Sequence, residues 1–438
     1  MPAIDAPAPH NRFVRRIYAN LGLLLTGKAA AGLISLAYMV IAAHALGPSR
    51  YGVLILVHGF VMTVGGIVEF PGWHAIVRYG AHCLESRDPE RLVRLLRFAT
   101  AVEACGGLLS IAAAALLAPI LGPRLGWSPE AQAFALPYSF AVLASIRATP
   151  AGYLQLMRRF DLLGMHNIVA PVVRLGGACV AAMIGAGLTG FLIAWLAAAL
   201  AEWLSLWMLG LWVASRELAR HRLLGSPRGA IAENRGIVQF MVAANADLTF
   251  SEFAGRIAPL VVGAMLGPAA AGLYAIAQRA TVIIQQPGQI LGQAAYAELA
   301  RAVAGGGSGS TIRRALLGCI AIALGTVLPL LAIISFFSDK IVVLLGGSGF
   351  ENAASLLPWM AAARAILLIA PPTSAALMAL GRPACSVFAN IVTSIGTLPL
   401  LPPLILKFGL IGTGLHALLQ AIAASALLSW FVWRESRR

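Results

Sequence analysis

Long apolar stretches separated by short polar loops follow one another along the chain from about residue 19 onwards. Most of these stretches exceed the roughly 18 apolar residues that a helix needs to cross a bilayer. They are rich in Ala, Leu and Gly, and they lack the short alternating segments that are typical of membrane β-barrels. The pattern predicts twelve membrane-spanning helices, numbered here as spans one to twelve: 19–45, 53–71, 97–121, 132–157, 165–187, 189–214, 237–265, 272–297, 313–338, 353–380, 384–406 and 408–433.

One tight turn between two spans occurs twice in the sequence. Leu46-Gly47-Pro48 and Gly52 separate spans one and two, and Leu266-Gly267-Pro268 and Gly272 separate spans seven and eight in the same spacing. Gly permits a turn conformation that other residues avoid, and Pro cannot continue the preceding helix. The second turn follows the first by half the chain length, which predicts a duplicated protein.

Further pairs of residues keep the same order at nearly the same offset as the turns, namely Pro150 with Pro372, Asn167 with Asn390, and Trp127 with Phe350. Because each half holds an even number of spans, the two halves share one orientation. The sequence therefore predicts an all-α integral membrane protein with two parallel six-helix repeats around a central cavity. The predicted divisions are a cytoplasmic N-terminal tail at 1–18, a first half at 19–214, a cytoplasmic linker at 215–236 and a second half at 237–438.

Charge and composition agree with this architecture. Charged residues make up 11% of the chain and hydrophobic residues 59%, whereas soluble domains carry roughly 25% charged residues. With the N-terminus in the cytoplasm, the cytoplasmic side holds 22 Lys and Arg residues and the other side four. This bias predicts that both termini are cytoplasmic. It also accounts for most of the net charge of +15, so attraction to anionic lipid suffices and nucleic-acid binding is not needed.

The largest early loop, at 78–97, contains several arginines. Arg87, Arg91 and Arg94 share one helical face, which predicts an amphipathic surface helix. The alternative is an extension of span three.

No pattern of catalytic or cofactor-binding residues is present. The five cysteines are scattered without a CxxC pair, which argues against a disulfide framework and a zinc site. The glycine runs form no phosphate-binding loop, and the histidines and serines lie in no nucleophile motif. The chain is therefore expected to be no enzyme, to need no cofactor or metal and to be no ATP-driven pump, which leaves a secondary transporter or flippase.

Several motifs resemble the multidrug/oligosaccharidyl-lipid/polysaccharide exporter superfamily, in particular its polysaccharide-flippase (Wzx-like) branch. They are the LGPxxYG turn from Leu46 to Gly52 with its echo from Leu266 to Gly272, the stretch LQLMRRF (Leu154 to Phe160), and LLGGSGFENAASLL (Leu344 to Leu357). The resemblance covers nearly the whole chain. The drug-exporting branch has the same number of spans, so length does not separate the two branches.

Ionisable residues at membrane depth are the candidates for function, because each costs at least about 2.5–3.5 kcal/mol to insert. Arg147 and Arg364 lie on the equivalent spans four and ten, each shortly before a proline. Two guanidinium groups facing a shared cavity would bind a diphosphate through paired hydrogen bonds. In the alternative, an acid on a neighbouring span neutralises each arginine. Further candidates for lining the cavity are Lys28, Arg174 and Arg279.

Carboxylates at similar depth are candidates for coupling transport to an ion gradient, because a desolvated carboxylate can take up a proton or help to bind Na⁺. These are Asp247 and Glu252 in span seven and Glu202 in span six, and the alternative is that they pair with arginines. Prolines that interrupt spans are candidates for hinges or for passive kinks. These are Pro150, Pro287 and Pro372.

The resemblance implies a secondary flippase of the bacterial inner membrane. Its cargo would be a polyprenyl-diphosphate-linked oligosaccharide, a precursor of surface polysaccharide or lipopolysaccharide, moved from the inner to the outer leaflet by alternating access. Its partners would be this cargo, membrane lipids and a glycan polymerase or glycosyltransferases. One alternative is a cation-coupled drug or metabolite exporter of the same superfamily, and another is a non-transporting scaffold for glycan assembly.

Overall fold

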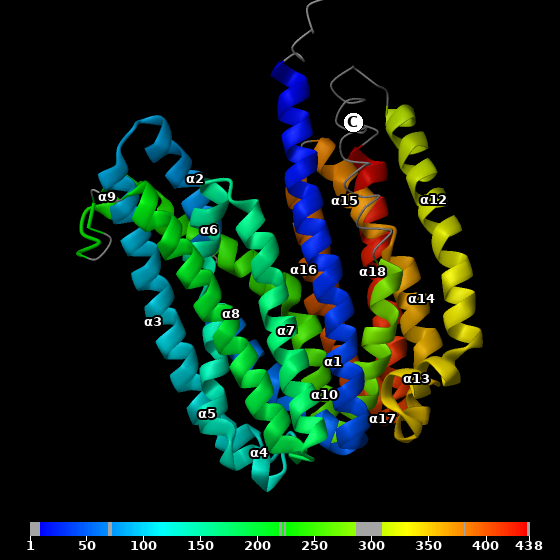
Figure 1. Cartoon of the computed structure of the whole chain (residues 1–438). Coiled ribbons are helices and arrows are strands. Elements are labelled where there is room, and N and C mark those ends of the chain that lie inside the picture. Colours follow the sequence, from blue (N-terminus) through cyan, green and yellow to red (C-terminus); the bar gives the residue numbers. More distant parts are fainter. Residues whose placement is uncertain are drawn as a thin grey trace, which may run out of the picture. The chain divides into compact units, whose positions relative to one another are not determined.

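A computed structural model describes residues 9–68, 72–218, 221–222, 225–285, 309–380 and 382–435. Within these ranges the chain forms α-helices and short 3-10 helices (η) and no strand (Figure 1). The helices before the linker are α1 (Pro9–Val68), α2 (Gly72–Glu85), α3 (Pro89–Leu121), α4 (Pro129–Ala133), α5 (Ala135–Ser139), η1 (Phe140–Ser145), α6 (Ala148–Leu156), α7 (Phe160–Met183) and α8 (Gly187–Glu217).

The linker contains one short helix, and the remaining helices follow it. They are α9 (Ala230–Glu233) in the linker, then α10 (Ile237–Thr281), η2 (Val282–Gln285), α12 (Gly309–Phe336), α13 (Ser338–Gly346), η3 (Ser348–Ala353), α14 (Leu357–Leu367), α15 (Ala370–Ala379), α16 (Pro383–Thr397), η4 (Leu398–Leu400), α17 (Leu401–Phe408) and α18 (Ile411–Glu435).

These helices account for the twelve predicted spans. Nine helical segments of the described residues are long and apolar enough to cross a membrane. Two of the nine hold two spans each, because α1 and α10 continue through their turns. Span four is divided among α5, η1 and α6 and is too broken to be counted. The nine segments therefore hold eleven of the predicted spans, and span four is the twelfth. Residues 286–297 of span eight lie outside the described residues.

The two repeated turns have the same backbone conformation. Gly47 has φ 68° and ψ 174°, and Gly267 has φ 85° and ψ 172°. A positive φ is costly for residues with a Cβ, which is why each turn carries glycine directly before its proline. The duplication read from the sequence is therefore present in the backbone.

The chain divides into two units by its internal contacts. Unit 1 comprises Met1–Ala42, Val64–Pro119 and Ala133–Ala246, and unit 2 comprises Ala43–Thr63, Ile120–Gln132 and Asp247–Arg438. Two segments of the predicted first half, 43–63 and 120–132, thus belong to unit 2. The division of the sequence at the linker stays a prediction.

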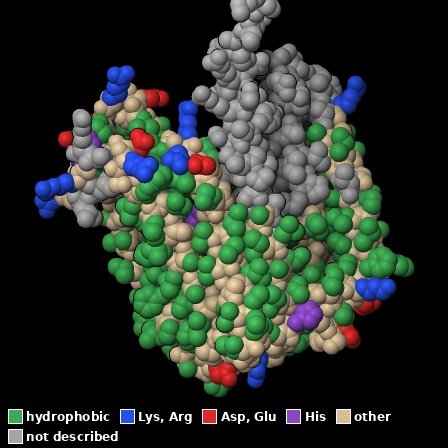
Figure 2. Space-filling model, in the orientation of Figure 1, with side chains coloured by type: hydrophobic (Ala, Val, Ile, Leu, Met, Phe, Trp, Pro, Cys, Tyr) green, Lys and Arg blue, Asp and Glu red, His purple; other side chains and the backbone are tan. Residues whose placement is uncertain are grey.

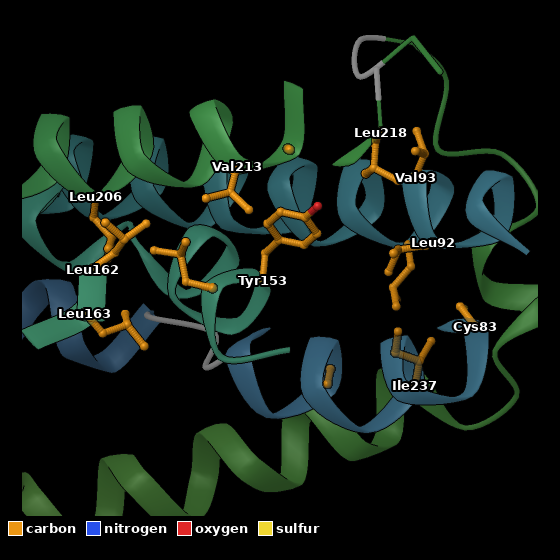
Figure 3. Close-up of a cluster of buried hydrophobic side chains, with 14 of the residues drawn as sticks. Cys83, Leu92, Val93, Tyr153, Leu162, Leu163, Leu206, Val213, Leu218 and Ile237 are labelled. Carbon is orange, nitrogen blue, oxygen red and sulfur yellow. The ribbon is translucent and has the colours of Figure 1, made fainter. Parts of the chain in front are cut away.

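A hydrophobic cluster joins the helices of unit 1 at one end (Figure 3). Leu92 of α3, Tyr153 of α6, Val213 of α8 and Ile237 of α10 are each at most 3% exposed within it. Four helices that are distant in the sequence thus share one packed core.

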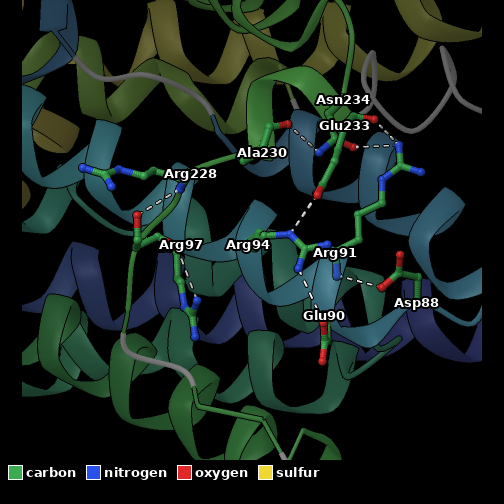
Figure 4. Close-up of polar contacts among 10 residues, drawn as sticks. Asp88, Glu90, Arg91, Arg94, Arg97, Arg228, Ala230, Glu233 and Asn234 are labelled. Carbon is green, nitrogen blue, oxygen red and sulfur yellow. Dashed lines mark hydrogen bonds and ion pairs between the residues drawn. The ribbon is translucent and has the colours of Figure 1, made fainter.

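Arginine side chains of α3 bind the linker through an ion pair and hydrogen bonds (Figure 4). Arg94 Nε lies 2.9 Å from Glu233 Oε1, and Arg91 donates to the Glu233 carbonyl oxygen. Both arginines belong to the first turns of α3, which runs without a break from Pro89. The separate surface helix predicted at 78–97 is therefore wrong. Residues 89–97 extend span three, because they continue its helix while their charged side chains hold the linker.

Hydrophobic side chains cover the sides of the helices on the face shown in Figure 2, and charged side chains gather near helix ends. On α3, for example, Leu108, Leu116 and Ile120 are 57–71% exposed. Large apolar side chains in such positions suit contact with lipid. The chain is a multi-pass membrane protein.

Candidate functional site

Span four of unit 1 is broken at Ile146 and Arg147. η1 ends at Ser145 and α6 starts at Ala148. Ile146 (φ −89°, ψ 70°) and Arg147 (φ −148°, ψ 7°) both leave the helical conformation. A helix that breaks at membrane depth frees backbone groups, and the protein itself must supply their partners.

Glu103 of α3 supplies one set of partners. Its carboxylate accepts hydrogen bonds from the backbone N–H groups of Ala148 and of Thr149, the latter at 2.9 Å. Glu103 is only 7% exposed, so a buried anion caps the positive end of α6. On the other side of the break, Trp207 Nε1 of α8 donates to the Ile146 carbonyl oxygen at 2.7 Å. Side chains from α3 and α8 therefore fix the break from both sides.

Arg147 forms an ion pair with Glu202 of α8. Its Nη1 also lies 3.3 Å from His166 Nε2, and His166 Nδ1 lies 3.0 Å from Ser205 Oγ. The pair carries no net charge and belongs to a polar network that joins α7 and α8 to the break. Two predicted site residues thus come together. Their contact supports the alternative in which an acid on a neighbouring span neutralises the arginine.

Span ten of unit 2 is interrupted near the equivalent position by a turn, although Leu368 (φ −62°, ψ −20°) and Ile369 (φ −67°, ψ −29°) keep the helical conformation. α14 ends at Leu367 and α15 starts at Ala370. Leu368 in this gap precedes Pro372 by as many positions as Ile146 precedes Pro150, so the turn in span ten and the break in span four occupy matching positions of the repeat. Ser425 Oγ of α18 donates to the Ile366 carbonyl oxygen at 3.0 Å. Spans six and twelve therefore each supply a donor to the interruption of the fourth span in their own unit.

The prolines near these breaks start half-helices. Pro150 is the third residue of α6, and Pro372 is the third residue of α15. The first turn of a helix tolerates proline because its N–H groups have no acceptor within the helix. A hinge role for these two prolines stays a prediction, and Pro287 lies outside the described residues.

A pocket of about 370 Å³ with several polar lining residues lies in unit 2 beside the turn in span ten. Its walls come from α10, α14, α16 and α18, and Arg364 of α14 is the one charged side chain among the described residues that line it. The other polar lining residues are Tyr274, Gln278, Asn390, Thr393, Ser394, His416 and Gln420.

Hydrogen bonds between α16 and α18 fix part of this lining. His416 Nε2 donates to the Thr397 carbonyl oxygen at 3.0 Å. Gln420 Nε2 donates to Ser394 Oγ at 3.4 Å. Amide and hydroxyl groups therefore occupy set positions along one wall of the pocket.

Arg364 differs from Arg147 in its electrostatic surroundings. Among the side chains that the structure describes, no carboxylate forms an ion pair with Arg364, and its described neighbours in the pocket are neutral. A guanidinium group beside several amides and hydroxyls suits a ligand that carries both phosphate oxygens and sugar hydroxyls.

Arg174 of α7 lies in an aromatic cage in unit 1. Its guanidinium carbon is 5.2 Å from the ring centres of both Tyr38 and Trp195, and Nη1 donates to the Tyr38 hydroxyl at 3.0 Å. Such cation–π contacts join α1, α7 and α8 and stabilise the guanidinium group at this position. The predicted role of Arg174 in lining a cavity stays a prediction.

Among the remaining predicted site residues, only Arg279 has a described side chain. Arg279 is partly buried near the end of α10. The side chains of Lys28, Asp247 and Glu252 lie outside the described part of the chain. No described group of three His, Cys, Asp or Glu side chains could hold a metal ion.

The sequence analysis missed Glu103 as a cap and the polar wall of the unit 2 pocket. The sequence pattern does indicate this polar wall, because Asn390, Thr393 and Ser394 fall on one helical face, as do His416 and Gln420. Glu103 offered no such signal, because its backbone partners lie 45 and 46 residues away.

Comparison with known proteins decides the family. The family model described as polysaccharide biosynthesis protein matches residues 41–355. The chain belongs to this family. A curated relative from Escherichia coli (strain K12), the inner membrane protein YghQ, is 26% identical over 291 residues, which make up 66% of this chain and 81% of that protein.

Solved transporter structures share the fold of this polysaccharide biosynthesis protein. An inward-facing multidrug resistance MATE transporter of the MOP superfamily matches with a TM-score of 0.73 and 15% identity, over 93% of this chain and 96% of that chain. The lipid II flippase MurJ in an inward closed conformation matches with a TM-score of 0.71 and 14% identity, over 95% and 89% of the two chains. The resemblance to the polysaccharide branch of this superfamily and the fold class read from the sequence are both confirmed.

Proposed function

We propose that this membrane transporter is a flippase for polyprenyl-diphosphate-linked oligosaccharide, moving it from the inner to the outer leaflet of a bacterial inner membrane. Both termini lie in the cytoplasm. The sugar-diphosphate head enters a polar site that includes the pocket of Arg364, while the polyprenyl tail stays in lipid. Membrane lipids and the enzymes that build or polymerise the glycan are its partners.

The observation that carries this proposal is the contrast between two arginines on equivalent spans. Arg147 has its countercharge in Glu202, whereas Arg364 lines a pocket whose described side chains are neutral. A diphosphate supplies the missing negative charge, and the guanidinium fork binds its oxygens in pairs. The amide and hydroxyl groups of α16 and α18 can donate to and accept from sugar hydroxyls.

The test replaces Arg364 in a strain that depends on this chain for surface glycan. Arg364→Gln removes the charge and keeps the length, and Arg364→Lys keeps the charge but loses the fork. Arg314→Gln is the matched control, because Arg314 is an exposed arginine at the start of α12. The measurements are the pool of lipid-diphosphate-linked oligosaccharide in membrane extracts and the amount of labelled surface glycan.

We expect Arg364→Gln to accumulate intact lipid-linked oligosaccharide and to lose surface glycan, with Arg364→Lys in between and Arg314→Gln unchanged. Both pools remaining at the parental level in Arg364→Gln would remove Arg364 from cargo binding. Both pools remaining at that level in a full deletion, in a strain without a second flippase, would favour the cation-coupled exporter, and dye efflux would test it.

A further inference from the structure

The two repeated turns interlock with each other within unit 2. A methyl group added to Gly52 would overlap the Pro268 carbonyl oxygen. A methyl group added to Gly272 would lie 2.5 Å from the Pro48 carbonyl oxygen. Each turn therefore presents a glycine to the proline carbonyl of the other turn. Backbone meets backbone at a distance that no residue with a side chain permits.

The loops after spans three and nine close around this contact. A methyl group on Gly126 would lie 2.8 Å from the Pro268 ring, and one on Gly349 would lie 3.0 Å from the Pro48 ring. Gly126 directly precedes Trp127, and Gly349 directly precedes its counterpart Phe350, so the two glycines are equivalent positions of the repeat. Each loop packs on the turn of the opposite half of the sequence. We call residues 47–52, 122–127, 267–272 and 346–350 the turn collar.

Aromatic side chains fill the spaces in the turn collar. Trp127 packs edge-on against Phe60 with ring centres 5.4 Å apart, and Phe350 packs against Tyr51 at 5.9 Å. All four side chains are at most 4% exposed. The collar is thus a tightly packed closure around two bare backbone contacts.

A line of contacts leads from the turn collar along span two and span seven. Leu56, one turn after Gly52 in α1, packs against Gly263, and Gly59, a further turn on, packs against Leu260. One turn further, Arg256 Nη1 donates to the Met62 carbonyl oxygen at 3.1 Å. These contacts recur about once per helical turn and reach the level of the pocket, because Ala254, Gly255 and Ala258 of α10 line it.

Span eight also connects the turn collar with the pocket. Tyr274 and Gln278, which line it, follow Gly272 within two turns of α10. With the cytoplasmic termini of the proposed topology, the four collar segments lie on the far side of the membrane. We propose that the turn collar is the gate on this far side, closed in this structure, and that it parts to connect the pocket of Arg364 with the outside. This inference rests on the proposed transport function.

Accessibility of a thiol in the pocket tests the gate. The reporter is Ser394→Cys, in a chain whose native cysteines, Cys83, Cys105, Cys179, Cys319 and Cys385, are replaced by serine. Intact cells are treated with a charged maleimide that does not cross membranes. Gly52→Ala and Gly272→Ala are introduced separately. Gly59→Ala is the matched control, because its methyl would meet Leu260 at an ordinary 3.7 Å on the same face of α1.

We expect the reporter to react about tenfold faster in Gly52→Ala and in Gly272→Ala than in the parent, because overpacking a closed contact shifts the equilibrium by a factor of that order. Gly59→Ala should react at the parental rate. Equal rates in all variants, with equal amounts of intact protein, would overturn the proposal. The assay measures labelling of a thiol and not export of glycan, so its result stands even if the cargo is different.

A cross-link provides the second measurement if the alanine variants do not fold. Gly126→Cys and Pro268→Cys are combined, again without the native cysteines, and joined by a short bifunctional reagent that forms reducible bonds. The linked collar should block reaction of the Ser394→Cys reporter added to this chain. In a chain that keeps Ser394, it should block glycan export until a reductant is added. Export at the unlinked rate through a linked collar would show that the collar is no gate.

Discussion

Arg147 and Arg364 lie on equivalent spans of the repeat, yet the structure predicts opposite responses to the loss of each charge. Arg147→Gln leaves the Glu202 carboxylate without its cation. Breaking a buried pair costs about 3–5 kcal/mol. The side chains of Arg147 and Glu202 are 37% and 21% exposed, and water therefore screens part of the effect. We expect a loss of about 2 kcal/mol of stability, below the fully buried range for that reason.

Arg364→Gln removes a charge that has no ion-pair partner among the described side chains. On insertion scales an arginine at the centre of a span costs about 2.5–3.5 kcal/mol. We therefore expect the stability of Arg364→Gln to be unchanged or higher than that of the parent, although export of glycan is lost.

The assay measures unfolding of the purified proteins in detergent, together with export in cells. A double-mutant cycle completes the test, because Glu202→Gln should restore most of the stability lost in Arg147→Gln by removing the unpaired carboxylate. A loss of stability in Arg364→Gln as large as that in Arg147→Gln would refute the reasoning, since it would show that Arg364 has a structural countercharge. Failure of Glu202→Gln to restore stability would refute the pairing.

Three further outcomes follow from single contacts. Glu103→Gln should destabilise by about 1–3 kcal/mol in thermal unfolding, because its amide nitrogen cannot accept one of the two backbone hydrogen bonds; an unchanged midpoint would contradict the cap. Gly47→Ala should cost about 1–2 kcal/mol through its positive φ alone, whereas Gly32→Ala, which also has open space, should cost nothing comparable. Glu233→Ala should speed proteolysis of the linker at low salt and have little effect at high salt, because its ion pair with Arg94 is partly exposed and salt screens it. Equal cleavage of parent and variant at low salt would show that this ion pair does not hold the linker.

The fold could be predicted from the sequence because the bilayer leaves few alternatives. Backbone groups in lipid must be paired within each segment, so long apolar stretches become helices. The turn at Gly47 and Pro48 and its copy at Gly267 and Pro268 then revealed the duplication, since a positive φ followed by proline needs these two residues together.

The roles of the charged residues could not be predicted in the same way. Arg147 and Arg364 look alike in the sequence, since each precedes a proline in an equivalent span. Their difference comes from partners on other helices. Glu202 is 55 residues from Arg147, and the neutral groups around Arg364 come from α10, α16 and α18. Spacing within one helix carries no information about such contacts, because packing between helices decides them.

The duplication itself provides an internal comparison for the cost of a buried charge. Both halves keep an arginine in their fourth span, and in both a side chain of the sixth span donates to a backbone carbonyl oxygen where the fourth span is interrupted. In unit 1 a carboxylate of the protein compensates the arginine, and that site gains little from an added anion. In unit 2 the described lining of the pocket offers Arg364 no carboxylate, so on the proposed function an anionic cargo gains binding energy from this arginine. The cargo's diphosphate should therefore bind at Arg364 and not at Arg147, and Glu202→Gln, which frees Arg147, should create a second anion site and slow the release of cargo.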